Sequence, residues 1–504
     1  MITVLILLVA VGVLVWGWNR ARLDGKAGIL AWLQSVMLMA PWLIVFSLFT
    51  FGVYLNIVAI LLILLISTIG YIVLGNRLRA LGPDALPRRQ SWATKQAGVT
   101  PDADGEGTQG AASTNPNAAN ATNAGNPTSG VPEVAQIPAA DLDQIRGIFG
   151  IDTFYATDTI PYMDGAIFRG NLRGEPDQSH QRLTLALEKK LGDRYRLFFV
   201  NGPDDRPTVV VLPSSNDPKP STVYQKGLAI ALALVTVATC FEASGIVLGF
   251  DLFSAPDRWL EPLGMAIGLI VILASHEIAH GFMARRHGVR LSFPFFLPTW
   301  QLGSLGAFTR FESLLPNRNV LFDIAFIGPA VGGLVSFILL IAGLSLSHQG
   351  GSLPLQSDFF QGSILVGVMA RAILGDAVQQ PYVEVHPWVV IGWLGLVINA
   401  INLMPAGQLD GGRIVQSVYG RKVAGRSTIV TLLILGIATL VNPLALYWAV
   451  VILFLQRDLE RPSLNELTEP DDTRAALALL ALFLMIATLL PLSPGLAGRL
   501  GIGG

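Results

Sequence analysis

The chain has 504 residues but only one cysteine, Cys240, so an internal disulfide and a zinc cluster built from thiolates are both excluded. Charged residues are also scarce: they make up 14% of the chain, against roughly 25% in soluble domains. The net charge is −1, which gives no basis for binding nucleic acid. Hydrophobic residues make up 52% of the chain. This composition predicts a protein that lies largely in a lipid bilayer.

The apolar residues gather in runs of roughly the 20 residues that an α-helix needs to cross a bilayer. We expect about eight to ten transmembrane helices, with the shorter runs tilted or incomplete. The runs lie at residues 2–18, 29–52, 53–75, 223–241, 263–283, 322–346, 387–403, 427–440, 445–455 and 475–490. The fold class predicted is therefore a polytopic α-helical membrane protein.

Two segments differ from these runs. Residues 98–132 are rich in Gly, Ala, Asn, Thr and Pro and contain no aromatic residue, which predicts a disordered linker. Residues 139–221 alternate between β-rich and helical patterns, with strands expected at 166–172, 195–200 and 208–212 and a helix at 177–191. They predict a small soluble α+β domain.

The expected organisation therefore has five parts. These are N-terminal transmembrane segments (residues 1–76), a basic flank with the disordered linker (77–138), the α+β domain (139–221), a catalytic membrane domain (222–460), and a C-terminal transmembrane helix with its tail (461–504).

The sequence His276-Glu277-Ile278-Ala279-His280 lies inside the apolar run 263–283, although the chain holds only six histidines. Ionisable residues are costly inside a membrane, so such a cluster indicates function. Residues four apart share one helix face. Both imidazoles can therefore bind one zinc ion, while Glu277 stays free to act on a zinc-bound water.

A catalytic zinc needs a third protein ligand and an open position. Asp410 is a candidate, because it follows an apolar run and precedes two glycines that allow close backbone approach. It lies 410 − 276 = 134 residues after His276, so a shared ion would be a tertiary arrangement. The alternative is that Asp410 caps a helix over residues 411–419, since Asp is a favoured N-cap.

The two motifs together, HExxH and then NxxPxxxLDG from Asn402, resemble the site-2 protease family of intramembrane zinc metalloproteases. The resemblance covers residues 223–455. It implies that His276, His280 and Asp410 bind Zn²⁺, that Glu277 is the general base, and that Asn402 helps to position substrate.

The run from Gly303 to Ala307 resembles the family's Gly-rich segment, which implies a membrane-dipping hairpin near the active site. Gly303, Ser304 and Gly306 are thus candidate substrate-positioning residues, and an open strand edge there would pair with an unwound substrate helix. The prolines and glycines of residues 293–311 exclude a continuous helix on their own account.

Residues 170–174, GNLRG, resemble a signature of the plant and cyanobacterial branch known as ethylene-dependent gravitropism-deficient and yellow-green proteases. No PDZ-like insertion separates the two catalytic motifs. We therefore expect regulation, and any regulatory partner, at the α+β domain.

The expected activity is hydrolysis of transmembrane segments of membrane proteins, in a plasma (inner) membrane or a thylakoid-type membrane. Basic clusters after several runs place the active site near the cytoplasmic face.

Three alternatives remain. A catalytically silent zinc-binding scaffold would not need Glu277. An ion transporter would use the histidines and Asp410 but give Glu277 no role. A prenyl-protein endopeptidase would be expected to use Glu as its third ligand.

Overall fold

The computed structural model describes residues 17–19, 21–22, 25–50, 63, 67, 74 and 137–502, apart from 163, 203–205, 348–352, 441–442 and 454–457. The chain forms two compact units, Met1–Pro127 and Thr128–Gly504. In the first unit, helix α2 (Gly25–Thr50) coincides with the second apolar run. The predictions for residues 2–16, for most of 53–75, and for the basic flank and linker lie outside the described residues.

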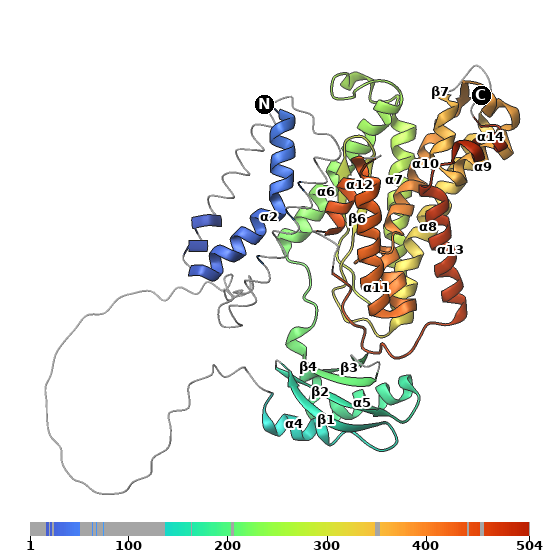
Figure 1. Ribbon diagram of the computed structural model, residues 1–504. Coiled ribbons are helices and arrows are strands. Elements are labelled where there is room, and N and C mark those ends of the chain that lie inside the picture. Colours follow the sequence, from blue (N-terminus) through green and yellow to red (C-terminus); the bar gives the residue numbers. More distant parts are fainter. Residues whose placement is uncertain are drawn as a thin grey trace, which may run out of the picture. The chain divides into compact units, whose positions relative to one another are not determined.

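The N-terminal part of the second unit contains a four-stranded antiparallel sheet with strand order β1-β2-β4-β3. Helix α5 packs on this sheet (Figure 1). The predicted strands and helix are present, and strand β1 and helix α4 are additional. Buried aromatic and aliphatic side chains from both helices and all four strands form one core. The elements are α4 (Ala139–Arg146), β1 (Phe154–Tyr162), β2 (Gly165–Leu172), α5 (Pro176–Leu191), β3 (Tyr195–Asn201) and β4 (Pro207–Pro213). The GNLRG sequence forms the end of β2 and the turn that leads to α5.

The rest of this unit is mostly helical. In the part of the chain that the structure describes, four helices are long and apolar enough to cross a membrane: α6 (Val223–Val247), α7 (Leu263–Arg286), α8 (Arg318–Leu346) and α13 (Asp472–Leu489). Apolar but shorter, or less uniformly apolar, helices accompany them: α10 (Trp388–Asn402), α11 (Asp410–Ala438) and α12 (Pro443–Val451). The total of eight to ten spans stays a prediction.

Helix α8 lies in the middle of this bundle and packs against α7, α10 and α11 (Figure 1). Between α7 and α8 the chain forms a two-stranded antiparallel hairpin, β5 (Phe295–Thr299) and β6 (Gly303–Phe308). The hairpin packs against α6, and β6 also reaches α7 and α10. The order α7, hairpin, α8, α10, α11 therefore brings both sequence motifs into one helical bundle.

A second small region lies between α8 and α10. It contains a short hairpin, β7 (Leu353–Gln356) with β8 (Tyr382–Val385), helix α9 (Ile364–Leu374) and two 3-10 helices (Ser357–Gly362 and Gly375–Gln379). It shares an apolar core with the C-terminal helix α14 (Pro494–Leu500).

A segment that we call the strap, Glu460–Glu466, runs between α12 and α13 and joins the sheet to the helices. The backbone N–H of Phe199 in β3 donates to the carbonyl of Leu464, and the N–H of Glu466 donates back to Phe199. On its other side, the N–H of Leu464 donates to the carbonyl of Leu315, just ahead of α8. The strap therefore extends the β3 edge and ties it to the catalytic bundle.

Candidate metal centre

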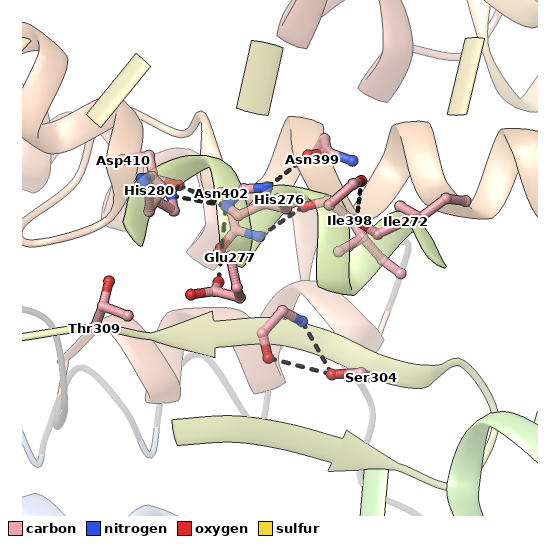
Figure 2. A network of polar contacts seen from close by, with 12 residues as sticks. Ile272, His276, Glu277, His280, Ser304, Thr309, Ile398, Asn399, Asn402 and Asp410 are labelled. Carbon is pink, nitrogen blue, oxygen red and sulfur yellow. Dashed lines mark hydrogen bonds and ion pairs between the residues drawn. The ribbon is translucent and has the colours of Figure 1, made fainter. Parts of the chain in front are cut away.

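Three side chains from two helices converge at one point (Figure 2). The Nε2 atoms of His276 and His280 are 3.0 Å apart. The Oδ2 atom of Asp410 lies 3.2 Å from the first and 3.3 Å from the second. Ligand atoms held about 2.0–2.1 Å from a tetrahedral zinc stand about 3.3 Å from one another. The structure thus brings together, at metal-ligand spacing, the three residues that the sequence singled out.

The hydrogen bonds of both imidazoles fix which nitrogen faces the centre. The Nδ1 of His280 lies 2.7 Å from the carbonyl oxygen of Ile324 in α8, which can only accept, so this Nδ1 carries the proton. The Nδ1 of His276 lies 2.8 Å from Oδ1 of Asn399 in α10. The amide of Asn399 is itself oriented, because its Nδ2 donates to the carbonyl of Gly395.

Each neutral ring therefore points a lone pair, on Nε2, at the other ring and at the Asp410 carboxylate. Three acceptors packed at this spacing repel one another unless protons or a cation lie between them. The donor set is two neutral imidazoles and a carboxylate, which suits Zn²⁺. The residues present therefore fit a zinc ion.

Glu277 lies beside this centre but apart from the three converging atoms. Its Oε1 is 4.0 Å from the Nε2 of His276, and its Oε2 is buried without a hydrogen-bond partner among the described residues. The side chain is only 10% exposed. A buried carboxylate oxygen with no partner is costly, so this position is better suited to transferring protons than to supporting the fold.

Asp410 does not cap its helix. Leu409 holds the N-cap position of α11 and makes no side-chain capping bond, while Asp410 is the first helical residue. The capping interpretation is therefore wrong, and the carboxylate is directed at the imidazoles. A Cβ on Gly411 would lie 1.9 Å from the carbonyl oxygen of Leu403, so the glycine lets the preceding loop close tightly over the start of α11.

Helix α8 comes unusually close to the two histidines. A Cβ on Gly328 would lie 2.1 Å from the Nε2 of His280, and one on Gly332 would lie 2.6 Å from Oδ1 of Asn399. Real Cβ contacts are never this short. These two glycines open the space on α8 that the imidazoles and their supporting amide occupy.

The hairpin predicted at residues 303–307 is present, and β6 runs past Glu277 (Figure 2). Gly306, with φ of +102°, lies so close to Asn402 that a Cβ would be 2.5 Å from its Nδ2. Gly303 packs in the same way against Cys240. Ser304 is fully buried, and its hydroxyl donates to the carbonyl of Leu297 within the hairpin. Ser304 therefore shapes the hairpin, while Asn402 and Gly306 lie at its contact with the metal centre.

A small cavity of about 10 Å³ opens at His280 and Asp410, and Thr309 and Asn402 are among the residues that line it. This is room for about one water molecule. Arg413, one turn after Asp410, closes another side: its Nη2 donates to the carbonyl of Thr309 at 2.8 Å and lies 2.9 Å from Oε2 of Glu460. The site therefore has room for about one water molecule and must open to admit a peptide.

The sequence motifs did not reveal the roles of Asn399, Gly328 and Arg413. Asn399 offered a signal, because it is a second amide in an apolar run, one helical turn before Asn402. Gly328 and Arg413 offered none, since their roles depend on contacts between distant elements.

Comparison with known proteins shows which family the chain resembles. The model of peptidase family M50 matches residues 264–442, which include all four site residues. The model of the EGY3 middle domain matches residues 143–219, the sheet region. No solved structure matches the chain significantly.

Curated relatives cover most of the chain. It is 39% identical over 365 residues to the probable zinc metalloprotease EGY2, chloroplastic, of Arabidopsis thaliana, covering 71% of this chain and 66% of that protein. It is 35% identical over 407 residues to the probable zinc metalloprotease EGY1, chloroplastic, of Oryza sativa subsp. japonica, covering 73% and 70%. The chain thus spans about two thirds of the length of these relatives. Motif, geometry and similarity agree: the chain belongs to peptidase family M50, the site-2 protease family of zinc metalloproteases, in its EGY branch.

Proposed function

We propose that this protein is an intramembrane metalloprotease that cleaves transmembrane segments of other membrane proteins. One observation carries the proposal. The nitrogens of His276 and His280 and an oxygen of Asp410 lie within 3.0–3.3 Å of one another. Beside them is the carboxylate of Glu277, whose Oε2 has no hydrogen-bond partner among the described residues. His276, Glu277 and His280 belong to α7, a helix long and apolar enough to cross a membrane. The substrate bond would thus be reached at membrane depth.

When bound by these ligands, zinc supplies Lewis acidity, which polarises a peptide carbonyl and makes a neighbouring water more acidic. Glu277 is placed to take a proton from that water, because its Oε2 has no hydrogen-bond partner in the described part of the chain. The same carboxyl group then returns the proton to the leaving amine. Asn399 and the carbonyl of Ile324 hold the imidazoles in the tautomer that leaves Nε2 free.

Access requires changes in both substrate and enzyme. Peptide bonds in an intact helix are shielded, so a substrate helix must unwind locally, and its freed backbone groups then need new partners. Strand β6 and the amide of Asn402 lie beside the centre and can offer such partners. Because the cavity is closed to anything larger than about one water, the hairpin or a neighbouring helix must move first.

A cleavage assay in reconstituted vesicles tests the proposal. The substrate would be a single-span protein with one helix-weakening Gly-Pro pair in its membrane segment. Mass spectrometry of the fragments should place the cut inside that segment. Cuts found only in the flanking soluble sequences would contradict an intramembrane protease.

The silent-scaffold alternative makes a different prediction. A zinc-loaded protein that binds substrate but yields no fragments under any lipid composition would favour it. We also propose that the sheet region, through the strap, is where a regulatory partner acts. The membrane is proposed to be a plasma or thylakoid-type membrane, consistent with the chloroplastic names of the plant relatives.

A further inference from the structure

A second, polar cavity of about 220 Å³ adjoins the metal centre. Its walls come from four separate parts of the second unit: the chain that leaves the sheet, the chain that leaves β6, the loop between α10 and α11, and the strap. Residues that line it include Lys219, Arg310, Phe311, Gln408, Glu460 and Arg461.

This cavity continues the path of β6 beyond the metal centre. Phe308 and Thr309 line the small cavity at His280 and Asp410, and the next residues, Arg310 and Phe311, line the larger one. Gln408 lines both. An extended peptide advances about 3.3 Å per residue. A chain lying along β6 through the metal centre would therefore enter the polar cavity within about two to four residues of the cleaved bond.

The cavity carries uncompensated positive charge. The carboxylate of its one acidic residue, Glu460, is already engaged: Oε2 accepts from Arg413, and Oε1 accepts from the backbone N–H of Arg461. Arg461 donates to the carbonyl of Asn216, which carries no charge. In the part of the chain that the structure describes, the exposed side chains of Lys219 and Arg310 make no hydrogen bond or ion pair.

We propose that this cavity binds an acidic flank of the substrate, a stretch of Asp or Glu residues that follows or precedes the transmembrane segment by a few positions. The inference rests on the proposed function and deepens it. It gives the enzyme a means to select substrates by the residues that flank their transmembrane segment. Lys219, Arg310 and Arg461 supply the charge, and β6 sets the distance from the cleaved bond.

Binding can be measured without cleavage in the zinc-loaded Glu277→Gln protein in lipid nanodiscs. Three single-span probes would share one membrane segment and carry four flanking residues of Asp/Glu, Asn/Gln or Lys. The acidic probe should bind at least about ten-fold more tightly than the lysine probe, with the difference shrinking at high salt. Equal affinity for all three probes would overturn the inference.

Reversing the charge of two cavity residues tests whether the acidic flank binds in this cavity. In the same background, Lys219→Glu with Arg310→Glu should remove or invert the preference. The matched control, Arg182→Glu with Lys189→Glu, makes the same change of charge on exposed residues of α5 and should preserve it. If the variant with Lys219→Glu and Arg310→Glu still prefers the acidic probe, the acidic flank binds elsewhere and the assignment to this cavity is wrong. Cleavage by the unmutated enzyme is scored separately: if it cuts none of the probes, the proposed function fails, while the binding comparison stands.

Discussion

At the scale of single residues, each imidazole of the candidate metal centre is held by a hydrogen-bond partner outside it. Each imidazole uses Nδ1 to hold itself in place and leaves Nε2 for the centre, with Asn399 serving His276 and Ile324 serving His280. Partners of this kind fix both the tautomer and the ring orientation of a metal-binding histidine.

Replacing Asn399 by Leu removes the acceptor for the Nδ1–H of His276, whereas Asn399→Asp keeps an acceptor there. We expect the Leu variant to bind zinc about 10–100-fold more weakly, and the Asp variant to retain most of the affinity. Competition with a fluorescent chelator on the purified proteins measures this. Equal zinc affinity in the Leu variant and the unmutated protein would show that the bond is dispensable.

The glycines of α8 give a second prediction. Gly328→Ala places a methyl group 2.1 Å from the Nε2 of His280, so the ring or the helix must shift. Gly333→Ala is the matched control in the same helix, because nothing lies within 4 Å of its added Cβ. The first variant should lose at least about ten-fold in zinc affinity, as when a ligand's support is disturbed, and the second should lose nothing. Similar zinc content in both would contradict the close packing.

The three residues that converge could be named from the sequence because HExxH is a local pattern and the NxxPxxxLDG motif resembles the family's second motif. Asn399 offered only the signal of a polar residue in an apolar run, which does not name its partner across α7 and α10. Gly328 offered no signal, because its role depends on the contact between α7 and α8. Their importance appears only once the helices are packed.

At the scale of elements, Arg413 joins three of them. It lies one turn after Asp410 in α11, donates to the carbonyl of Thr309 at the end of β6, and pairs with Glu460 of the strap. Both charged side chains are over 90% buried. The guanidinium also lies 4.8 Å from the ring of Phe311. The hairpin, the metal-ligand helix and the strap are thus held in one arrangement.

Arg413→Met should destabilise the protein by about 3–5 kcal/mol, because it leaves the Glu460 carboxylate buried and unpaired. The double variant with Glu460→Leu should recover most of that loss, but not the hold on Thr309, so kcat/KM should stay low. Thermal unfolding and cleavage of a single-span probe measure the two effects separately. Full activity in the stabilised double variant would reduce Arg413 to a purely structural residue.

Hydropathy predicted α6, α7, α8 and α13 well because each contains a long apolar run. It did not predict α9 and α14, which are short. Strand β1 was missed since it is an edge strand with polar residues and Pro161 in it. Helix α4 has only eight residues and a weak apolar pattern. The prolines and glycines of the hairpin segment predicted an irregular segment in place of a helix. The hairpin itself was predicted from the resemblance to the family's Gly-rich segment.

At the scale of the whole molecule, the strap links the sheet to the catalytic bundle. Asn465 secures it, because its Nδ2 donates to Asp177 in α5 at 2.7 Å and its Oδ1 accepts from the N–H of Leu467. No sequence pattern indicates this link, since the strap and the strand that it joins are more than 260 residues apart. The strap thus connects the sheet to Glu460 and, through it, to Arg413.

Asn465→Ala should loosen the strap while leaving the zinc site intact. We expect faster amide exchange at Phe199 and Glu466, the two residues whose backbone bonds join β3 to the strap. The control, Glu469→Gln, changes a carboxylate that is 80% exposed and should have little effect. Unchanged exchange at Phe199 in the Asn465→Ala variant would mean that the sheet is held by other contacts.

The central claim is that zinc binding and proton transfer belong to different residues of one site. It is tested most directly by measuring zinc content and cleavage together in Glu277→Gln and His280→Ala, with the unmutated enzyme as reference. Glu277→Gln should keep about one zinc per chain and cleave nothing, since it loses only the base. His280→Ala should lose most of its zinc and its activity together. Cleavage by Glu277→Gln at the rate of the unmutated enzyme, or loss of its zinc, would contradict the account.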